Sequence, residues 1–388
     1  MSRIDDLIRD LCPNGVEYKP LGELLNYEQP GPYLVSSKEY DLDYPTPVLT
    51  AGATFILGHT NERHGIYPAS QDSPVIIFDD FTTASKWVDF PFKAKSSAMK
   101  ILASSTGDPT DLRYIYYVLD ALNYTPSTHS RQWISMFSNM PIAFPPRRVR
   151  EYIVSTLNYF KALEAELEAE LEARQHQYTY YRDILVAPHN SNQLVKLGAV
   201  SRIARGASPR PIRQFITDST GVPWIKIGDV PPGGKHITST VQHITEDGAT
   251  RSRRIKPGDF VLSNSMSFGR PFISKIDGCI HDGWLVISDY EKTFDQDFLY
   301  HVLRSSPIQK DFTQRAGSGT VRNLNSTIVG ETLVPAPPID QQRDIVDLLD
   351  KFDLLVNDLT SGLPAEIEAR RKQYEYYRDR LLTFPEKK

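Results

Sequence analysis

The feature that most constrains this chain is a long sequence repeat. Residues 170–185 read ELEARQHQYTYYRDIL and residues 366–381 read EIEARRKQYEYYRDRL, with 11 of 16 positions identical at a distance of 196 residues. Identity at this level between distant segments indicates a tandem duplication, so the chain has to be read as two related units. Its 388 residues are sufficient for two domains, each with a core of its own.

The cysteine content and the first residues bear on the cellular compartment. Cys12 and Cys279 are the only cysteines, too few for a disulfide framework or a thiolate zinc site, which indicates a reducing environment. The first twelve residues carry a charge every two or three positions, and no apolar run approaches the ~18 residues of a membrane span. We therefore expect a cytoplasmic protein without an export signal or membrane anchor.

Each unit begins with a Leu-Gly pair, at residues 21–22 and 197–198, and continues through short apolar stretches separated by Gly, Pro, Asn and Ser. Stretches such as residues 75–78 (VIIF) and 260–263 (FVLS) are rich in β-branched or aromatic side chains. This composition predicts short strands. Each unit is therefore expected to contain a mixed α/β globule.

A different pattern follows the proline pairs at residues 145–146 and 337–338, where apolar side chains recur at the spacing of an amphipathic helix. The predicted seam of the two helices, which also forms part of the expected partner surface, consists of Leu157, Phe160, Leu167, Leu171, Tyr178, Tyr181, Leu349, Phe352, Leu363, Ile367, Tyr374 and Tyr377. Matching seams favour an antiparallel coiled coil. The proline pairs are 192 residues apart and the repeats 196, so the second helix has four extra residues, and Gly362 with Pro364 predicts a break there.

The predicted fold class is α+β: two α/β globules with short β-strands, separated by two long helices that pair as an antiparallel coiled coil, with pseudo-two-fold symmetry. The expected boundaries are residues 1–146 for the first globule, 147–186 for the first helix, 187–338 for the second globule and 339–388 for the second helix.

Charge differs between the two globules, although the whole chain carries only −4. Residues 200–330 contain 17 Lys and Arg against 12 Asp and Glu, a balance of +5, whereas residues 15–140 contain 9 against 14, a balance of −5. The basic second globule favours a nucleic-acid partner. The acidic first globule is better explained by an alternative, a coiled-coil adaptor whose globules bind protein or glycan.

Several phrases of the sequence are typical of one family. They are LCPNGVEYKPLGEL at residues 11–24, VPWIKIGDV at 222–230, GSGTVRNLNS at 317–326, PPIDQQRDIVDLLDKFD at 337–353, and both QYxYYRD phrases of the repeat. Over its whole length the chain resembles the DNA-specificity subunits of type I restriction-modification enzymes.

The resemblance implies a subunit without catalytic activity of its own. Each globule becomes a target-recognition domain that reads one part of a split, asymmetric target in double-stranded DNA. The helices dock two methyltransferase subunits, which methylate N6 of adenine, and the full assembly adds two restriction subunits. The implied cofactors lie on those partners: S-adenosylmethionine on the methyltransferase, and ATP and Mg on the restriction subunit.

The first helix has a length that suits a spacing role. Residues 149–185 comprise 37 positions, which at 1.5 Å per residue give a rod of roughly 55 Å, comparable with about 16 base pairs. Helix length is therefore expected to set the spacer between the two parts of the target.

Two polar loops in each unit are candidates for DNA contact, because base readout requires donors and acceptors that reach the grooves. The candidates of the first loops are Thr82, Thr83, Ser85, Lys86, Trp87, Ser265, Ser267 and Arg270. Those of the second loops are Ser127, His129, Arg131, Gln132, Ser318, Thr320, Arg322 and Asn323. Candidate phosphate contacts are Arg205, Arg210, Arg251, Arg253 and Arg254. The alternative for each loop is an ordinary solvated turn.

No motif for catalysis or metal binding accompanies these loops. The GSGT of residues 317–320 lacks the Lys of a nucleotide-binding loop, and Cys279 with His281 is too sparse for a metal site. The chain also lacks an Asn-Pro-Pro-Tyr phrase and the clustered carboxylates of a nuclease. We expect a binding protein that is not an enzyme and holds no metal.

Overall fold

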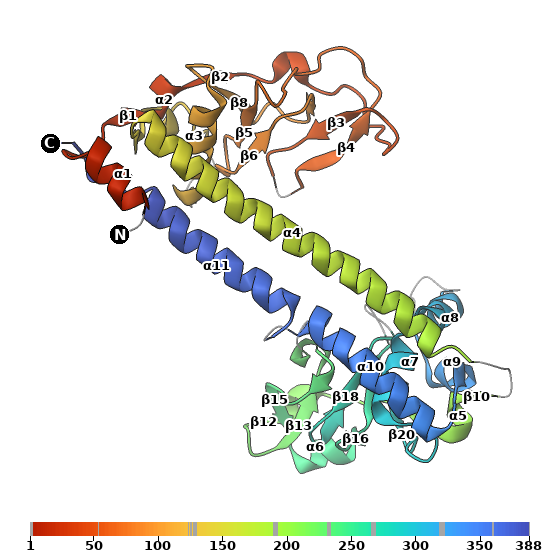
Figure 1. The fold of residues 1–388 in the computed structure, drawn as a ribbon. Coiled ribbons are helices and arrows are strands. Elements are labelled where there is room, and N and C mark those ends of the chain that lie inside the picture. Colours follow the sequence, from red (N-terminus) through yellow and green to blue (C-terminus); the bar gives the residue numbers. More distant parts are fainter. Residues whose placement is uncertain are drawn as a thin grey trace. The chain divides into compact units, whose positions relative to one another are not determined.

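The computed structural model describes residues 3–52, 54–122, 124, 126, 130–188, 193–230, 234–264, 269–317, 323–358 and 361–387 (Figure 1). The chain forms two compact units. Unit 1 consists of residues 1–165 together with 369–388, and unit 2 consists of residues 166–368. Each unit therefore combines a globule with parts of both long helical regions, which cuts across the four linear segments of the sequence.

Unit 1 contains a four-stranded antiparallel sheet in the order β2-β8-β5-β6 and a three-stranded sheet in the order β4-β3-β7. The first sheet consists of β2 (Leu25–Glu28), β8 (Met99–Ser104), β5 (Val75–Asp79) and β6 (Ser85–Val88). The second consists of β4 (Ile56–Thr60), β3 (Thr46–Leu49) and β7 (Lys93–Ala94). The remaining α-helices and strands of the globule are α1 (Arg3–Leu11), β1 (Tyr18–Pro20), α2 (Leu21–Leu24), α3 (Pro109–Leu122) and β9 (Pro141–Ala143).

Unit 2 has the same plan, with a main sheet in the order β11-β20-β17-β18-β14 and a second sheet in the order β12-β15-β13-β19-β16. The main sheet consists of β11 (Arg202–Arg205), β20 (Trp284–Ser288), β17 (Phe260–Ser263), β18 (Pro271–Ser274) and β14 (His236–Ile237). The second consists of β12 (Ile216–Thr217), β15 (Gln242–Ile244), β13 (Val222–Ile225), β19 (Gly278–Ile280) and β16 (Arg253–Ile255). The other α-helices and strands of this globule are β10 (Leu194–Lys196), α5 (Leu197–Val200), α6 (Glu246–Thr250), α7 (Gln296–Arg304), α8 (Ser306–Ala316), α9 (Ser326–Glu331) and β21 (Leu333–Pro335).

The buried strand in each main sheet explains the continuous apolar runs of the sequence. In β5, Ile76 and Phe78 share a core with residues of α3, whereas Val75 and Ile77 share another with residues of the three-stranded sheet. In β17, Phe260 and Leu262 pack with α7 while Val261 packs with the second sheet. Alternate side chains of a strand point to opposite faces, so a strand covered on both faces is apolar throughout. The α+β fold class predicted from the sequence is confirmed.

The long helices are α4 (Arg147–Leu185), α10 (Ile339–Asn357) and α11 (Leu363–Leu381). The predicted break in the second helical region is confirmed, because α10 ends at Asn357 and α11 begins at Leu363. Gly362 is buried, and a Cβ added there would lie 2.5 Å from the carbonyl oxygen of Leu354. Only glycine fits this turn, and Pro364 falls in the first turn of α11, where its missing N–H costs nothing.

Within unit 1, α4 and α11 run antiparallel (Figure 1). The ring of Phe160 stacks on Tyr377 with centroids 5.3 Å apart, and one turn further along α4 Glu164 pairs with Arg371 at 2.6 Å. Within unit 2, Tyr181 of α4 stacks on Phe352 of α10 at 5.9 Å. The helices contact each other through these pairs.

The predicted seam divides into three groups by burial. Leu157, Tyr178, Leu349, Ile367 and Tyr374 are buried, and four of them belong to the globule cores: Leu157 and Tyr374 in unit 1, Tyr178 and Leu349 in unit 2. Phe160, Leu167, Leu171, Phe352 and Leu363 are half-buried. Tyr181 and Tyr377 are 41% and 37% exposed. Part of the predicted helix-to-helix seam therefore faces a globule instead.

The segment that follows α11 completes unit 1 by pairing with residues near the start of the chain. The N–H of Val16 donates to the Pro385 carbonyl at 2.9 Å, and the N–H of Lys387 donates to the Val16 carbonyl at 2.9 Å. The Tyr18 hydroxyl donates to the Phe384 carbonyl at 2.9 Å. These bonds fix the position of α11 on the first globule.

In the part of the chain that the structure describes, each helix is too short or too polar to span a membrane.

Candidate nucleic-acid interface

The first candidate loop of unit 1 connects β5 to β6 and has a defined shape. Asp79 Oδ1 accepts the N–H groups of Phe81 and Thr82 at 2.9 and 2.8 Å. Thr83 adopts φ +63°, which is rare for a β-branched residue, and its hydroxyl donates to the Tyr124 carbonyl at 2.9 Å. Such strain is found where the surroundings hold a residue for a function.

The side chains of this loop border a cavity of about 290 Å³. Thr82, Thr83, Ser85 and Lys86 line one side of it, and Asp120 of α3 contributes a carboxylate. Trp87 is directed elsewhere: its indole N–H donates to Asp89 at 3.2 Å and its ring lies 4.5 Å from the Arg113 guanidinium. The side chains of Thr82, Ser85 and Lys86 thus border the cavity, whereas the Thr83 hydroxyl and Trp87 have partners within the protein.

The second candidate loop of unit 1 lies against the first. The N–H of Gln132 donates to the Asp80 carbonyl at 2.8 Å, and the N–H of Trp133 donates to Asp80 Oδ1 at 2.8 Å. Arg131 is exposed beside these bonds, but Gln132 is only 5% exposed, and its amide donates to the Ser130 carbonyl at 2.9 Å. Gln132, expected to contact DNA, thus holds its own loop in place.

The corresponding loops of unit 2 approach each other in the same way. The N–H of Leu324 donates to the Asn264 carbonyl at 3.0 Å, the counterpart of the bond between Gln132 and Asp80. The Asn264 amide donates to the Asp282 carbonyl at 2.8 Å. Arg270 and Asn323 are exposed at the described ends of the two loops. Seven other candidates lie outside the described residues: Ser127, His129, Ser265, Ser267, Ser318, Thr320 and Arg322.

Three of the five candidate phosphate contacts gather beside Asn264. Arg205 donates to the Asp282 carbonyl at 3.0 Å, Arg253 donates to the Arg205 carbonyl at 3.1 Å, and Arg210 lies 3.8 Å from the Asp282 carboxylate. The Arg210 side chain is 83% exposed, so its charge remains available. A hydrogen bond from Ser208 and the nearby Arg210 keep the pKa of Asp282 below its ordinary value, so this carboxylate stays ionised.

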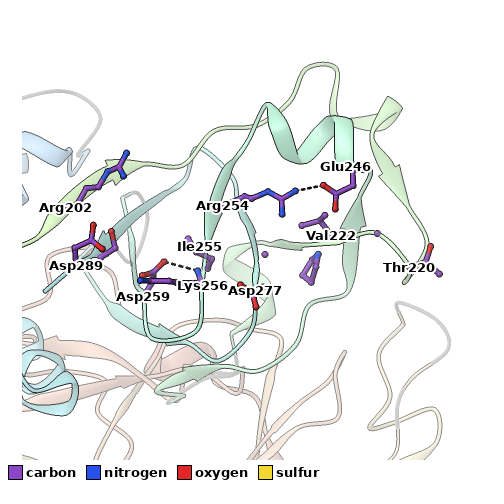
Figure 2. Close-up of a pocket in the computed structure, with 14 residues that line it drawn as sticks. Arg202, Thr220, Val222, Glu246, Arg254, Ile255, Lys256, Asp259, Asp277 and Asp289 are labelled. Carbon is purple, nitrogen blue, oxygen red and sulfur yellow. Dashed lines mark hydrogen bonds and ion pairs between the residues drawn. The ribbon is translucent and has the colours of Figure 1, made fainter. Parts of the chain in front are cut away.

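The other two arginines lie away from the loops and are paired with acids of α6. Arg251 contacts Asp247 at 3.2 Å, and Arg254 contacts Glu246. Figure 2 shows Arg254 directed towards Glu246 at the edge of a cavity of about 570 Å³. Asp259 also lines this cavity and precedes β17, whereas Asn264 follows it, so the cavity and the loops mark opposite ends of the strand.

The cavity in Figure 2 has mixed charge. Lys256 and Arg202 line it together with the carboxylates of Asp259, Asp277 and Asp289. Asp259 is 4% exposed, one oxygen accepts the Lys256 N–H at 2.9 Å, and burial raises its pKa. Within the described ranges, no three His, Cys, Asp or Glu side chains lie close enough to hold a metal ion.

The sequence reasoning missed the residues that join the loops. Asp80, its partner Lys100, Asn264 and Asp282 were absent from the predicted site. A signal existed for one of them, because a Lys in the apolar stretch MKILAS at residues 99–104 needs a partner when the strand is buried.

The paired loops on duplicated α/β globules define a class of protein, one that presents two different polar surfaces from a shared scaffold. Comparisons with known proteins identify the family. Residues 190–369 match the family described as the type I restriction modification DNA specificity domain. The chain is 41% identical to the Type I restriction enzyme EcoR124I/EcoR124II specificity subunit of Escherichia coli, covering 99% of this chain and 98% of that protein.

Further relatives agree. A putative type I restriction enzyme specificity subunit of Haemophilus influenzae is 27% identical, covering 95% of this chain and 96% of the relative. The fold is similar to that of the S subunit of a type I restriction-modification system from M. genitalium, with a TM-score of 0.53 and 16% identity, over 95% and 96% of the two chains. A chain from a structure of a type I R-M system gives a TM-score of 0.59 at 14% identity, over 92% and 97%. The protein belongs to the specificity subunits of type I restriction-modification enzymes, whose role is DNA sequence recognition.

Proposed function

We propose that each unit reads one half of a bipartite, asymmetric DNA target through its two loops. The observation that carries the proposal is the shared main-chain bond, Gln132 to Asp80 in unit 1 and Leu324 to Asn264 in unit 2. It joins loops whose sequences differ between the units. A main-chain bond that is the same in both units, combined with loop side chains that differ, suits the reading of two different half-sites.

In unit 1 the proposed contacts are Thr82, Ser85 and Lys86, which border one cavity, and Arg131, which is exposed next to the bond between Gln132 and Asp80. In unit 2 they are Arg270 and Asn323 for bases, with Arg205, Arg210 and Arg253 for phosphates. The acidic balance of the first globule does not oppose this, because a focused patch of a few cations is sufficient for phosphate contact.

The test is to co-express the chain with a type I methyltransferase subunit and to map N6-methyladenine across the genome. The wild-type chain is expected to give one bipartite motif. Arg270→Ala is expected to relax the bases of one half, and Arg131→Ala those of the other. Arg251→Ala, whose side chain is paired with Asp247, is the matched control and should leave the motif unchanged. Methylation that does not depend on this chain would contradict the proposal.

We further propose that α4 sets the spacer. Its 39 residues correspond to a rod of about 58 Å. Removing one helical turn within residues 164–172 should change the spacer in the mapped motif by about one or two base pairs. An unchanged spacer in that variant would refute the role, and replacing the same residues by Ala without changing the length is the control.

The helices are also proposed to dock two methyltransferase subunits and, through them, restriction subunits. Tyr180 and Tyr376 occupy the same position of the repeat and are 62% and 59% exposed. Large exposed aromatic side chains preserved in both copies suit one partner used twice. Adenine N6 methylation would then use S-adenosylmethionine held by the methyltransferase, and ATP with Mg would act on the restriction subunit.

Native mass spectrometry can test this docking. Tyr180→Ala and Tyr376→Ala should each leave one methyltransferase bound, and the double variant should leave none. Tyr159→Ala is the control, because Tyr159 is 66% exposed on α4 but has Lys351 at the equivalent place after the second proline pair. Retention of two methyltransferases by the double variant would exclude these tyrosines from the interface.

A further inference from the structure

We propose that a buried ion pair between Asp80 and Lys100 positions both loops of unit 1 and thereby sets base discrimination in the half-site that this unit reads. The inference rests on the proposed function. Lys100 Nζ lies 3.2 Å from Asp80 Oδ2, and both side chains are only 1% exposed. Neither residue can reach DNA itself, so both act as positioning residues.

Asp80 is the point where the two loops meet. It follows β5 directly, and its N–H donates to the Ala98 carbonyl at 3.0 Å. Its own carbonyl accepts from Gln132 and its Oδ1 accepts from Trp133, each at 2.8 Å. A displacement of the Asp80 carboxylate would therefore move the residues next to Arg131.

Lys100 holds that carboxylate from β8. In the described part of the chain Lys100 Nζ has no hydrogen-bond partner, so the Asp80 carboxylate balances its charge, with the Tyr27 ring 5.9 Å away. An unpaired buried charge is far more costly than a buried polar group, which ties the position of Asp80 to that of the strand.

Unit 2 shows that the fold does not require this ion pair. Phe78 pairs with Lys100 across β5 and β8, and Leu262 pairs with Leu285 across β17 and β20. Asp80 and Asn264 each stand two residues after the first member of these pairs. The equivalents of Asp80 and Lys100 are thus Asn264 and Leu285, a neutral arrangement that still joins the loops through the Asn264 carbonyl.

A buried ion pair adds little stability compared with a well-packed apolar pair, whereas its geometry is restrictive. The charged arrangement in unit 1 is therefore better explained by the placement of the loops than by the stability of the sheet. The two roles, placing the loops and stabilising the sheet, can be separated by experiment. A neutral pair that preserves the fold should still alter the discrimination between bases in the half-site of unit 1.

The experiment uses the whole chain in complex with the methyltransferase and the variant Asp80→Asn/Lys100→Leu, which copies the arrangement of unit 2. Methylation rates are measured on the mapped target and on targets with one base changed in either half, the halves being those assigned by Arg131→Ala and Arg270→Ala. In the double variant, discrimination in the half of unit 1 should fall at least about tenfold, a difference of about 1.4 kcal/mol. Discrimination in the half of unit 2 and the melting temperature should remain as in the wild type.

Asp80→Asn/Lys100→Met is the second variant, should the variant with Leu at position 100 fail to fold, because it keeps a long side chain at that position and leaves no buried charge without a partner. It should relax the same half, and the amides of Gln132 and Trp133 should exchange hydrogen faster than in the wild type. Wild-type discrimination in a folded variant, or equal relaxation of both halves, would overturn the inference. If the wild-type chain itself directs no methylation, the proposed function fails first and separately.

Discussion

The two repeated tyrosines, Tyr374 in unit 1 and Tyr178 in unit 2, sit in equivalent environments that are built from different residues. In unit 1 the Tyr374 ring has the Arg378 guanidinium at 5.8 Å and Lys161 Nζ at 4.4 Å. In unit 2 the Tyr178 ring has Arg182 at 5.5 Å and Arg304 at 5.7 Å. Each ring therefore interacts with one arginine of its own helix and with a second cation from another element.

The positive and negative side chains near the two rings exchange places between the units. In unit 1 the cation, Lys161, belongs to α4 and the carboxylate, Asp120, to the globule helix α3, where it accepts from Tyr374 at 3.3 Å. In unit 2 the cation, Arg304, belongs to the globule helix α7 and pairs at 2.9 Å with Asp353 of α10.

The sequence shows the same exchange. YYVLD at residues 116–120 corresponds to YHVLR at residues 300–304, and residues 161 and 353 each lie 16 positions after the first proline of their pair. We call the contact between globule and helices around each of the two tyrosines the junction of that unit. The duplication has preserved the balance of charges at each junction but not the sign of the charge at each position. Each globule is therefore matched to the helix that follows it.

The junctions also differ in their capacity to take up protons. In unit 2 the His301 ring contacts Tyr178 at 3.1 Å and Asp350 at 3.0 Å. In unit 1 the corresponding contact joins the Tyr117 hydroxyl to Asn158 at 2.6 Å. Only the first of these two contacts contains an imidazole, the side chain whose ordinary pKa of about 6.5 lies near neutral pH.

The largest effect is expected from reversing the globule charge of unit 2. The variant Arg304→Asp places a second carboxylate next to Asp353. The native side chains of Arg304 and Asp353 are only 25% and 18% exposed, so water screens the repulsion between the two carboxylates weakly. The variant should lose about 3 kcal/mol of stability. The loss of stability of unit 2 alone can be measured from the hydrogen exchange of the α7 amides at increasing urea concentration.

A compensating change tests whether the exchange of charges is real. Arg304→Asp/Asp353→Lys reproduces the order of charges in unit 1 and should recover at least half of the lost stability. A double variant no more stable than Arg304→Asp would show that the two positions do not depend on each other.

A smaller effect is expected for the matching change in unit 1. In the native protein Asp120 lies 3.4 Å from Arg378, so the variant Asp120→Arg places two cations next to each other. The Asp120 side chain is 41% exposed, and water therefore screens the repulsion. The loss should be about 1 kcal/mol, read from the amides of α3. Asp72→Arg on the exposed surface adds the same charge and should have little effect. A loss equal to that of Arg304→Asp would contradict the assigned difference in burial.

The smallest effect at neutral pH is expected from His301 of unit 2, whose contribution to stability changes only as the pH is lowered. Burial lowers the pKa of His301, so the unfolded chain binds more protons than the folded one between that pKa and about 6.5. Stability should therefore fall as pH falls below about 6.5, by at most about 1.4 kcal/mol per pH unit from this group, and level off below the folded pKa. The amides of α3 in unit 1 provide the reference.

The matched control for pH is His301→Tyr/Asp350→Asn, which copies Tyr117 and Asn158. It retains His236 and His281, whose pKa values burial also lowers, so the change in slope isolates His301. An identical slope in this variant would assign the pH dependence to those other histidines.

The sequence by itself determined the duplicated organisation, the strands and the helix break. The run VIIF and the spacing after residues 145–146 are local signals of strand and helix, because they report side-chain periodicity. Gly362 and Pro364 predicted the break for an equally local reason, the backbone conformations that these two residues allow or forbid. The choice of two loops in each unit also came from local composition.

Only the tertiary structure decided which distant segments meet. It assigned residues 369–388 to unit 1, joining Tyr374 to Asp120 across 254 positions of sequence, and it turned Gln132 inward while placing Asp80 and Lys100 together in the core. Periodicity carries no information about such pairs, since a charged side chain becomes a partner or a surface group according to what packs over it. The repeat of residues 170–185 revealed that the chain is duplicated, but only the folded units showed that the charges exchanged between the two sequences lie around Tyr178 and Tyr374.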